Sequence, residues 1–274
     1  MTGHRASVAS PVADVTSGAT ITPENTPATP ENTPANPGAE RLYGRRRGHK
    51  LRLGQQVLMD EVLPRLRVGL DQLAALGPRG MFSKPVTGAW LEIGFGGGEH
   101  LAAQAAAHPD IGLIGCEVYE NGIVTLLAAL DRRVAAGAPA LDNLRLMVED
   151  ARRVLDALPV ASIDRVFVLF PDPWRKARHH KRRLISRSTL DRLAVVMADG
   201  AELRLATDHV DYLRQMLSLA PIHPAFDWQV QGPADWRHRP DDWPQTRYER
   251  KGIEAGRPPT FLRLRRRPRN TSEG

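Results

Sequence analysis

Short apolar runs alternate with segments of helical periodicity over the middle of the chain. Five nearly unbroken apolar runs, typical of buried strands, lie at residues 89–93, 111–118, 144–148, 163–170 and 201–206. Five segments with apolar residues at helical spacing lie at residues 99–107, 122–134, 151–158, 190–197 and 210–217. This alternation predicts an α/β fold in which a mostly parallel sheet carries helices on both faces.

The pattern changes towards the N-terminus. Residues 54–76 keep the helical spacing but contain Pro64, which predicts a helical region that is broken or kinked there. Residues 1–40 carry the heptad TPENTPA twice in tandem and have few bulky apolar side chains. Such a segment buries too little surface to offset its chain entropy, so we expect a disordered Pro/Thr-rich tail. The alternative is a Pro-rich spacer with some extended bias.

Composition removes several classes of protein. The chain is 42% hydrophobic, yet no stretch approaches the roughly 18 consecutive apolar residues of a membrane span. The N-terminus lacks the apolar core of a signal peptide. Cys116 is the single cysteine, which excludes an intramolecular disulfide framework. These features predict a cytoplasmic protein without a membrane partner, and no spacing of His and acidic residues suggests a metal site.

Positive charge is concentrated in three blocks. Outside residues 1–40 the chain carries 37 basic and 27 acidic residues. The blocks lie at residues 41–52, 175–187 and 263–269. One such block alone is as consistent with a solvated surface as with a binding site. Three blocks on one chain of this size favour a nucleic acid as partner.

A glycine-rich loop follows the first predicted strand, with Gly94 and Gly96 at its start. Glycine allows a tight turn and a close approach of the backbone to a ligand. A dinucleotide fingerprint requires Gly or Ala where this chain has Glu99, so a nicotinamide dehydrogenase is disfavoured.

Acidic residues lie at three successive strands around this loop. Glu92 is inside the first strand, Glu117 ends the second, and Asp150 follows the third. Acids at these places can hold a cation, ribose hydroxyls and a base amino group, respectively. Each alone is also compatible with a capping or surface carboxylate. Together they suit a nucleoside without phosphates, and S-adenosylmethionine fits that description.

The fourth strand leads into FPDPWRKARHHKRR, residues 170–183. Its prolines stiffen a turn that places Asp172 at the carboxyl end of the strand, where Trp174 can stack on a base. The alternative is a plain turn with a core tryptophan.

These motifs together resemble the bacterial tRNA (guanine-N7)-methyltransferase family. Residues 45–55 (RRRGHKLRLGQ), 206–208 (ATD) and 246–249 (TRYE) are also similar to the family pattern. The resemblance covers residues 41–266 and implies a single class I methyltransferase domain, Rossmann-like, with a seven-stranded sheet. Its last strands would lie near residues 226–231 and 260–265. We expect a monomer or homodimer, and a basic, disordered tail at residues 267–274.

The resemblance also implies roles for individual residues. Asp172 would be catalytic, and the cofactor S-adenosylmethionine would contact Glu92, Gly94, Gly96, Glu117 and Asp150. The substrate would contact Lys176, Asp208, Thr246, Arg247, Tyr248 and Glu249. The RNA would contact Arg178, His179, His180, Lys181, Arg182 and Arg183. The expected product is N7-methylguanosine at position 46 of tRNA, in the variable loop.

Guanine N7 carries a lone pair and no proton, so its attack on a methyl group needs no base. We therefore expect Asp172 to act by orientation and electrostatics on a ring that becomes cationic. Two alternatives stay open: methylation of an exocyclic amine of a base, and an RNA-binding module without catalysis.

Overall fold

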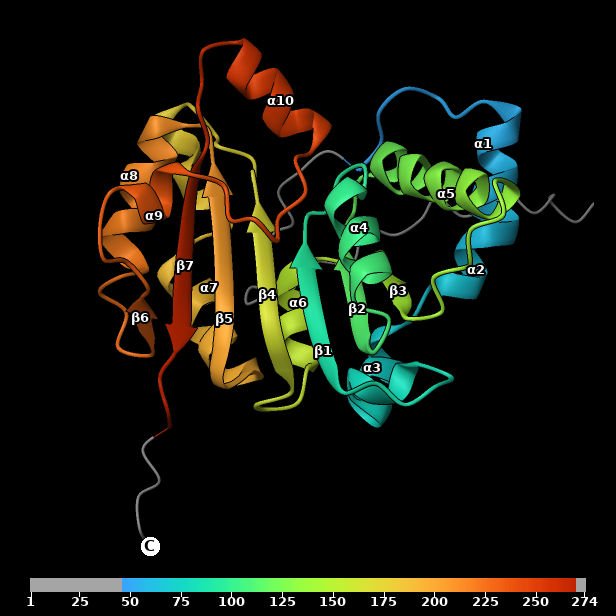
Figure 1. Ribbon diagram of the computed structural model, residues 1–274, viewed down its shortest axis with the longest axis horizontal. Helices are drawn as coiled ribbons and strands as arrows, with labels where there is room; N and C mark the ends of the chain where they lie inside the picture. Colours follow the sequence, from blue (N-terminus) through green and yellow to red (C-terminus); the bar gives the residue numbers. More distant parts are fainter. Residues whose placement is uncertain (1–45, 270–274) are drawn as a thin grey trace, which may run out of the picture. The chain divides into compact units, whose positions relative to one another are not determined.

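The strands form one sheet of seven in a computed structural model that describes residues 46–269 (Figure 1). Its order is β3-β2-β1-β4-β5-β7-β6, and β1 to β5 are parallel while β7 is antiparallel to both of its neighbours. The strands are β1 (Gly88–Ile93), β2 (Ile111–Cys116), β3 (Leu144–Met147), β4 (Ile163–Leu169), β5 (Met197–Thr207), β6 (Phe226–Trp228) and β7 (Thr260–Arg266). The α/β class and the seven-stranded sheet are confirmed.

Helices cover both faces of this sheet. In Figure 1, α4 (Glu99–Ala107) and α5 (Glu120–Ala135) lie in front of it, and α6 (Ala151–Ala157) and α7 (Arg187–Val196) lie behind. The rear layer also includes α8 (Val210–Leu219), whose Met216 packs in one apolar cluster with residues of α6 and α7.

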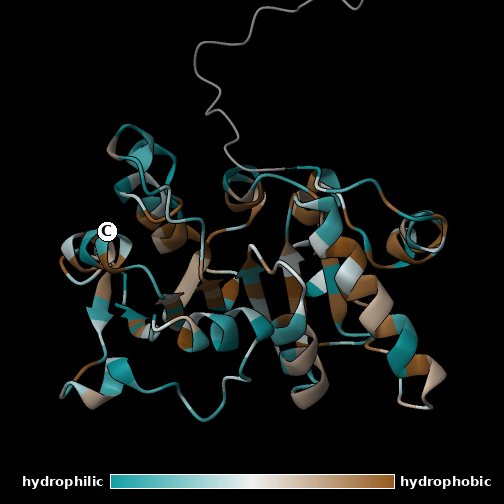
Figure 2. Cartoon of the chain, turned by 90° about the horizontal axis from the view of Figure 1, so that it is seen from above, coloured by the Kyte–Doolittle hydropathy of each residue, from teal (hydrophilic) through white to brown (hydrophobic). Residues whose placement is uncertain are grey.

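Successive side chains of β1 point to opposite faces of the sheet and pack in two different apolar clusters. Leu91 and Ile93 belong to the apolar cluster of the rear layer, whereas Trp90 packs in the front cluster. Viewed from above, brown and tan segments are frequent in the central strands, and teal segments are frequent in the surrounding loops and helices (Figure 2). The central β4 has Val166, Phe167 and Val168 fully buried, in keeping with its continuous apolar sequence.

The N-terminal helical region is divided more finely than its periodicity predicts. It consists of α1 (Leu53–Val57), a π-helical turn (Leu58–Val62), α2 (Leu63–Leu66) and α3 (Leu70–Leu76). Pro64 lies in the first turn of α2, where its missing N–H does not cost a helical hydrogen bond. The register of the helix therefore changes just before the proline.

Several short elements were absent from the sequence prediction. They are two 3-10 turns (Arg79–Met81 and Ala177–Arg182), α9 (Ala234–Arg237) and α10 (Arg247–Glu254). In α10 only Glu249 and Gly252 are buried, so no apolar stripe marks this helix in the sequence.

Of the two predicted tails, only residues 267–269 lie within the described part of the chain. The segment 1–40, expected to be disordered, lies outside the described residues, as do Arg41, Arg45 and residues 270–274. The expectation of a disordered tail is wrong for residues 267–269. Arg267 pairs with Asp227 at 2.7 Å, and the guanidinium of Arg269 donates to the carbonyl of Met197 at 2.6 Å.

Candidate functional site: two joined cavities at the carboxyl edge of the sheet

Two cavities open where β1, β2 and β4 end. The larger, of about 510 Å³, is lined by residues from the ends of β1, β2, β3 and β4, among them Glu117, Asp150 and Asp172. The smaller, of about 300 Å³, lies between the glycine loop and the start of α10. Gly94, Gly96, Phe170 and Tyr248 line both. The carboxyl edge of the sheet is therefore where the predicted cofactor and reaction residues meet.

The glycine loop leaves open space in front of its backbone. Gly94 and Gly96 have φ of +74° and +54°, a region that other residues seldom adopt. A Cβ atom at either position would have no neighbouring atom within 4 Å. The loop thus borders the cavity directly, as close approach of a ligand requires.

Glu117 holds this loop in place. One carboxylate oxygen accepts the N–H of Gly96 at 2.9 Å, and the other accepts the N–H groups of Val118 and Tyr119 at 2.7 and 2.9 Å. A carboxylate has about four acceptor positions, so room is left for one ribose hydroxyl. The sequence predicted ligand contact at Glu117 but did not reveal this second role.

Asp150 is a helix cap, as one of the two sequence interpretations allowed, and it also borders the larger cavity. Its carboxylate accepts the backbone N–H of Arg152 at 2.9 Å and so caps the start of α6. The same side chain is buried and lines the larger cavity.

Glu92 lies in a buried pair with a histidine that no sequence motif marks. Nδ1 of His100 is 2.7 Å from Oε2 of Glu92, and both side chains are 3% exposed. Both residues line the smaller cavity. A histidine eight residues after a strand acid gives no signal in sequence, because the contact depends on how α4 crosses β1.

The turn that carries Asp172 is conformationally unusual. Phe170 and Trp174, on either side of it, have φ of +53° and +44°. Non-glycine residues rarely adopt such angles, and surrounding contacts must hold them. Asp172 is exposed and lines the larger cavity together with Trp174.

Arg183 supplies one of those contacts, which corrects the prediction that it faces RNA. Its side chain is 1% exposed. The guanidinium donates to the carbonyl of Pro173 at 2.8 Å and to Gln215 and Asp211 on α8 at 2.8 and 2.5 Å. The hydrogen bond from Arg183 also lowers the pKa of Asp211. Arg183 is therefore part of the scaffold under the Asp172 turn.

Other members of the basic run present charge outward. Lys176, Arg178 and Lys181 are exposed, whereas the guanidinium of Arg182 lies 5.0 Å from the ring centre of Trp174. His179 makes an edge contact with the same ring, and Nε2 of His180 is 3.3 Å from Asp211.

The predicted substrate segment starts α10. The Thr246 hydroxyl accepts the N–H of Glu249 and caps this helix, and Tyr248 lies over Phe170 with ring centres 5.2 Å apart. Thr246, Arg247 and Tyr248 line the smaller cavity.

Glu249, the last residue of this segment, and Asp208 each make an ion pair. Neither lines a cavity. Glu249 is buried and pairs with Arg239 at 3.2 Å. Burial raises its pKa, although the Arg239 charge opposes this shift. Asp208 pairs with Arg257 at 2.9 Å. Lys176, likewise predicted to contact substrate, is also absent from both linings.

Comparison with known proteins connects this geometry to a family. A family model described as a putative methyltransferase matches residues 87–262. A tRNA (guanine-N(7)-)-methyltransferase of Rhodospirillum rubrum is 52% identical over 237 residues, or 85% of this chain and 91% of that protein. The chain belongs to the tRNA (guanine-N7)-methyltransferase family.

Two more proteins are similar to this chain, one in sequence and one in structure. A tRNA (guanine-N(7)-)-methyltransferase of Brucella anthropi is 45% identical over 230 residues, or 84% of this chain and 96% of that protein. The solved 16S rRNA methyltransferase KamB is 16% identical, with a TM-score of 0.48, over 72% of this chain and 92% of that one.

In this tRNA (guanine-N7)-methyltransferase family member, Cys116 ends β2 and borders the larger cavity. Its thiol is 3.3 Å from the carbonyl of Glu149, and burial raises its pKa well above the ordinary value. Within residues 46–269, no group of three His, Cys, Asp or Glu side chains could hold a metal ion. In the same range, no helix has the length and apolar character needed to cross a membrane.

Proposed function

We propose that this chain transfers the methyl group of S-adenosylmethionine to N7 of a guanine in tRNA, at position 46 of the variable loop. The observation that carries the proposal is that Asp172 and the glycine loop line one cavity. The family membership and the activity named for the relatives support the substrate and the reaction.

The residues around the cavities fit such a cofactor. Glu117 and Asp150 project from the ends of β2 and β3 into the larger cavity and suit ribose hydroxyls and an adenine amino group, respectively. Glu92 lies on the neighbouring side of the glycine loop, where a carboxylate can balance an ammonium group. The open space in front of Gly94 and Gly96 completes this cradle.

When bound, S-adenosylmethionine supplies a methyl group that is electrophilic because it is attached to a sulfonium. Guanine N7 needs no proton removed before it attacks. Asp172 accepts hydrogen bonds from guanine N1–H and N2–H and so favours the positive charge that develops on the ring. Phe170 and Tyr248 present aromatic faces at the junction of the two cavities, where the guanine ring stacks.

The decisive experiment compares the parent protein with Asp172→Ala on an unmodified tRNA transcript and methyl-labelled S-adenosylmethionine. After reduction and aniline treatment, we expect one cleavage in the variable loop. We expect the rate to fall roughly a hundredfold or more in the variant. Asp71→Ala, an exposed change on α3, serves as the matched control with the parent rate.

Other outcomes would select other functions. Label in RNA without aniline-sensitive cleavage would indicate methylation of an exocyclic amine. RNA binding without any label would indicate a module that binds RNA and does not methylate it.

A further inference from the structure

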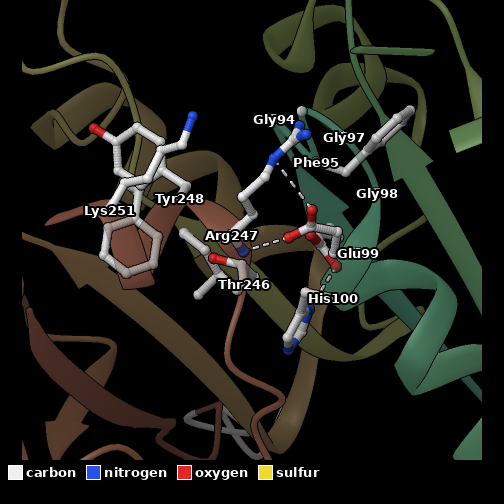
Figure 3. Close-up of a pocket in the computed structure, with 14 residues that line it drawn as sticks. Gly94, Phe95, Gly97, Gly98, Glu99, His100, Thr246, Arg247, Tyr248 and Lys251 are labelled. Atoms are coloured by element: carbon white, nitrogen blue, oxygen red, sulfur yellow. Dashed lines mark hydrogen bonds and ion pairs between the residues drawn. The ribbon is translucent and has the colours of Figure 1, made fainter. Parts of the chain in front are cut away.

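Glu99, the residue that separates this loop from a dinucleotide fingerprint, contacts the substrate segment. It is the first residue of α4, directly after the glycine loop. Its Oε2 accepts the backbone N–H of Arg247 at 2.5 Å, and its Oε1 is 3.6 Å from Nε of the same residue (Figure 3). One carboxylate thus binds both the backbone and the side chain at the start of α10, which is 148 residues away in the chain.

A second residue of α4 holds the chain just before this point. Nε2 of Gln104 donates to the carbonyl of Asp242 at 2.7 Å. The Asp242 carboxylate in turn pairs with the buried Arg204 of β5 at 2.7 Å. The segment between Asp242 and Arg247 is therefore attached to α4 at both of its ends.

Few apolar side chains fix the position of helix α10. Its buried residues are Glu249 and Gly252, so apolar packing contributes little to its placement. Polar contacts must then determine where Thr246 and Tyr248 lie relative to the glycine loop. A hydrogen bond from a backbone N–H to a carboxylate is among the stronger of such contacts.

We infer that Glu99 is a positioning residue, which holds the Thr246–Glu249 segment against the cofactor loop so that the target nucleotide is bound beside the cofactor. The inference rests on the proposed function, because it assigns the segment to the binding of that nucleotide. Glu99 lines the smaller cavity but not the larger one, and both of its carboxylate oxygens face Arg247. Its removal should therefore weaken the binding of tRNA and leave cofactor binding in the absence of RNA near the parent value.

The test uses Glu99→Ala and the isosteric Glu99→Gln in the full chain. Asp156→Ala is the control, because it removes a comparably exposed ion pair, with Arg192, between α6 and α7. We expect the KM for tRNA to rise about tenfold in Glu99→Ala and about threefold in Glu99→Gln, which keeps an acceptor for the N–H. The kcat, the Kd of S-adenosylhomocysteine without RNA, and the Tm should stay near the parent values.

A second measurement does not depend on activity. Hydrogen exchange of the Arg247 amide should speed up in Glu99→Ala and stay near the parent rate in Asp156→Ala. Unchanged exchange, an unchanged KM for tRNA, or a weakened Kd of S-adenosylhomocysteine would each overturn the inference. If the parent protein does not methylate guanine N7, the proposed function fails, and the exchange measurement still shows whether Glu99 holds this segment.

Discussion

The guanidinium of Arg183 holds the Asp172 turn from inside the protein. It lies in a run of basic residues whose sequence suggests uniform exposure to RNA, yet it binds Pro173 and α8 and packs over the ring of Tyr212 at 4.9 Å. Arginine suits this place because its planar fork can donate to several acceptors at once. Single residues in one charged run thus have opposite roles.

We expect Arg183→Ala to reduce stability and activity, and Lys181→Ala to reduce tRNA binding. Loss of Arg183 leaves the Pro173 carbonyl and Gln215 without their buried donor, so the free energy of unfolding should fall by about 2–4 kcal/mol. The kcat should fall as well, because the Asp172 turn is no longer held. Lys181→Ala should weaken tRNA binding and leave the Tm unchanged.

Thermal unfolding and methyl-transfer kinetics on the same samples would check this pair. An Arg183→Ala protein with the parent Tm and a raised KM for tRNA would instead support the original expectation of a direct RNA contact.

At the scale of elements, the long connection from β6 to α10 is held against the sheet by specific contacts. It crosses the face of the sheet in front of β5 (Figure 1). Trp243 packs there against Phe261 and Ala206. Next to it, the carboxylate of Asp242 pairs with Arg204. An irregular segment is thereby fixed through two adjacent residues.

This attachment should depend on pH. Burial opposes ionisation of Asp242, but the hydrogen bond and the charge of Arg204 outweigh it, so the pKa of Asp242 is lowered in the fold. A carboxyl group with a lowered pKa stabilises the fold above its unfolded pKa, about 4, and this contribution is lost as the pH falls through the folded pKa.

The free energy of unfolding should therefore fall less steeply in acid for Asp242→Asn than for the parent. Urea titrations between pH 7 and about pH 3 would measure both slopes. Asp241→Asn, at the exposed neighbouring position, should keep the parent slope. Equal slopes for Asp242→Asn and the parent would show that the ion pair does not contribute.

Elements with an apolar period could be predicted from the sequence, and those without one could not. The helix 99–107 matches α4, and the predicted strand 163–170 exceeds β4 by only one residue. The predicted start of α7 is too late because polar residues occupy its first turn, and that of β5 is too late because Met197 was assigned to the preceding helix. Helix α10 was missed because no apolar stripe marks it and because it is held by contacts such as that with Glu99, which is remote in sequence.

The same limit applies to the site. Glu92, Glu117, Asp150 and Asp172 could be proposed because strand ends meet at one edge. The contact between Glu92 and His100 could not, because it follows from how a helix packs across a strand.

At the scale of the whole molecule, positive charge is divided between opposite edges of the sheet. The run after β4 lies at the carboxyl edge beside the cavities. Since β7 is antiparallel, its arginines approach the other edge, where Arg263 pairs with Glu202 and Arg267 with Asp227. Arg263, Arg266, Arg267 and Arg269 of this third block make contacts within the protein, which its sequence does not reveal.

Measurements of Tm and of the salt dependence of tRNA binding should show that the basic residues at the two edges have different roles. The double variant Arg267→Gln, Arg269→Gln should have a Tm lower by a few degrees and an unchanged affinity for tRNA. Replacing Lys176 and Lys181 together should reduce the slope of log Kd against log salt concentration by about two, because each lysine neutralises about one phosphate. The opposite assignment of these effects would place the RNA at the far edge.

Cys116 can serve as a chemical reporter of access to the larger cavity. Because this cysteine is the single thiol of the chain and borders the larger cavity, any alkylating reagent that modifies it must first reach that space. Its raised pKa keeps the thiolate scarce and the reaction slow. The rate of covalent labelling then reports access to the cavity, and a molecule bound there should slow the labelling.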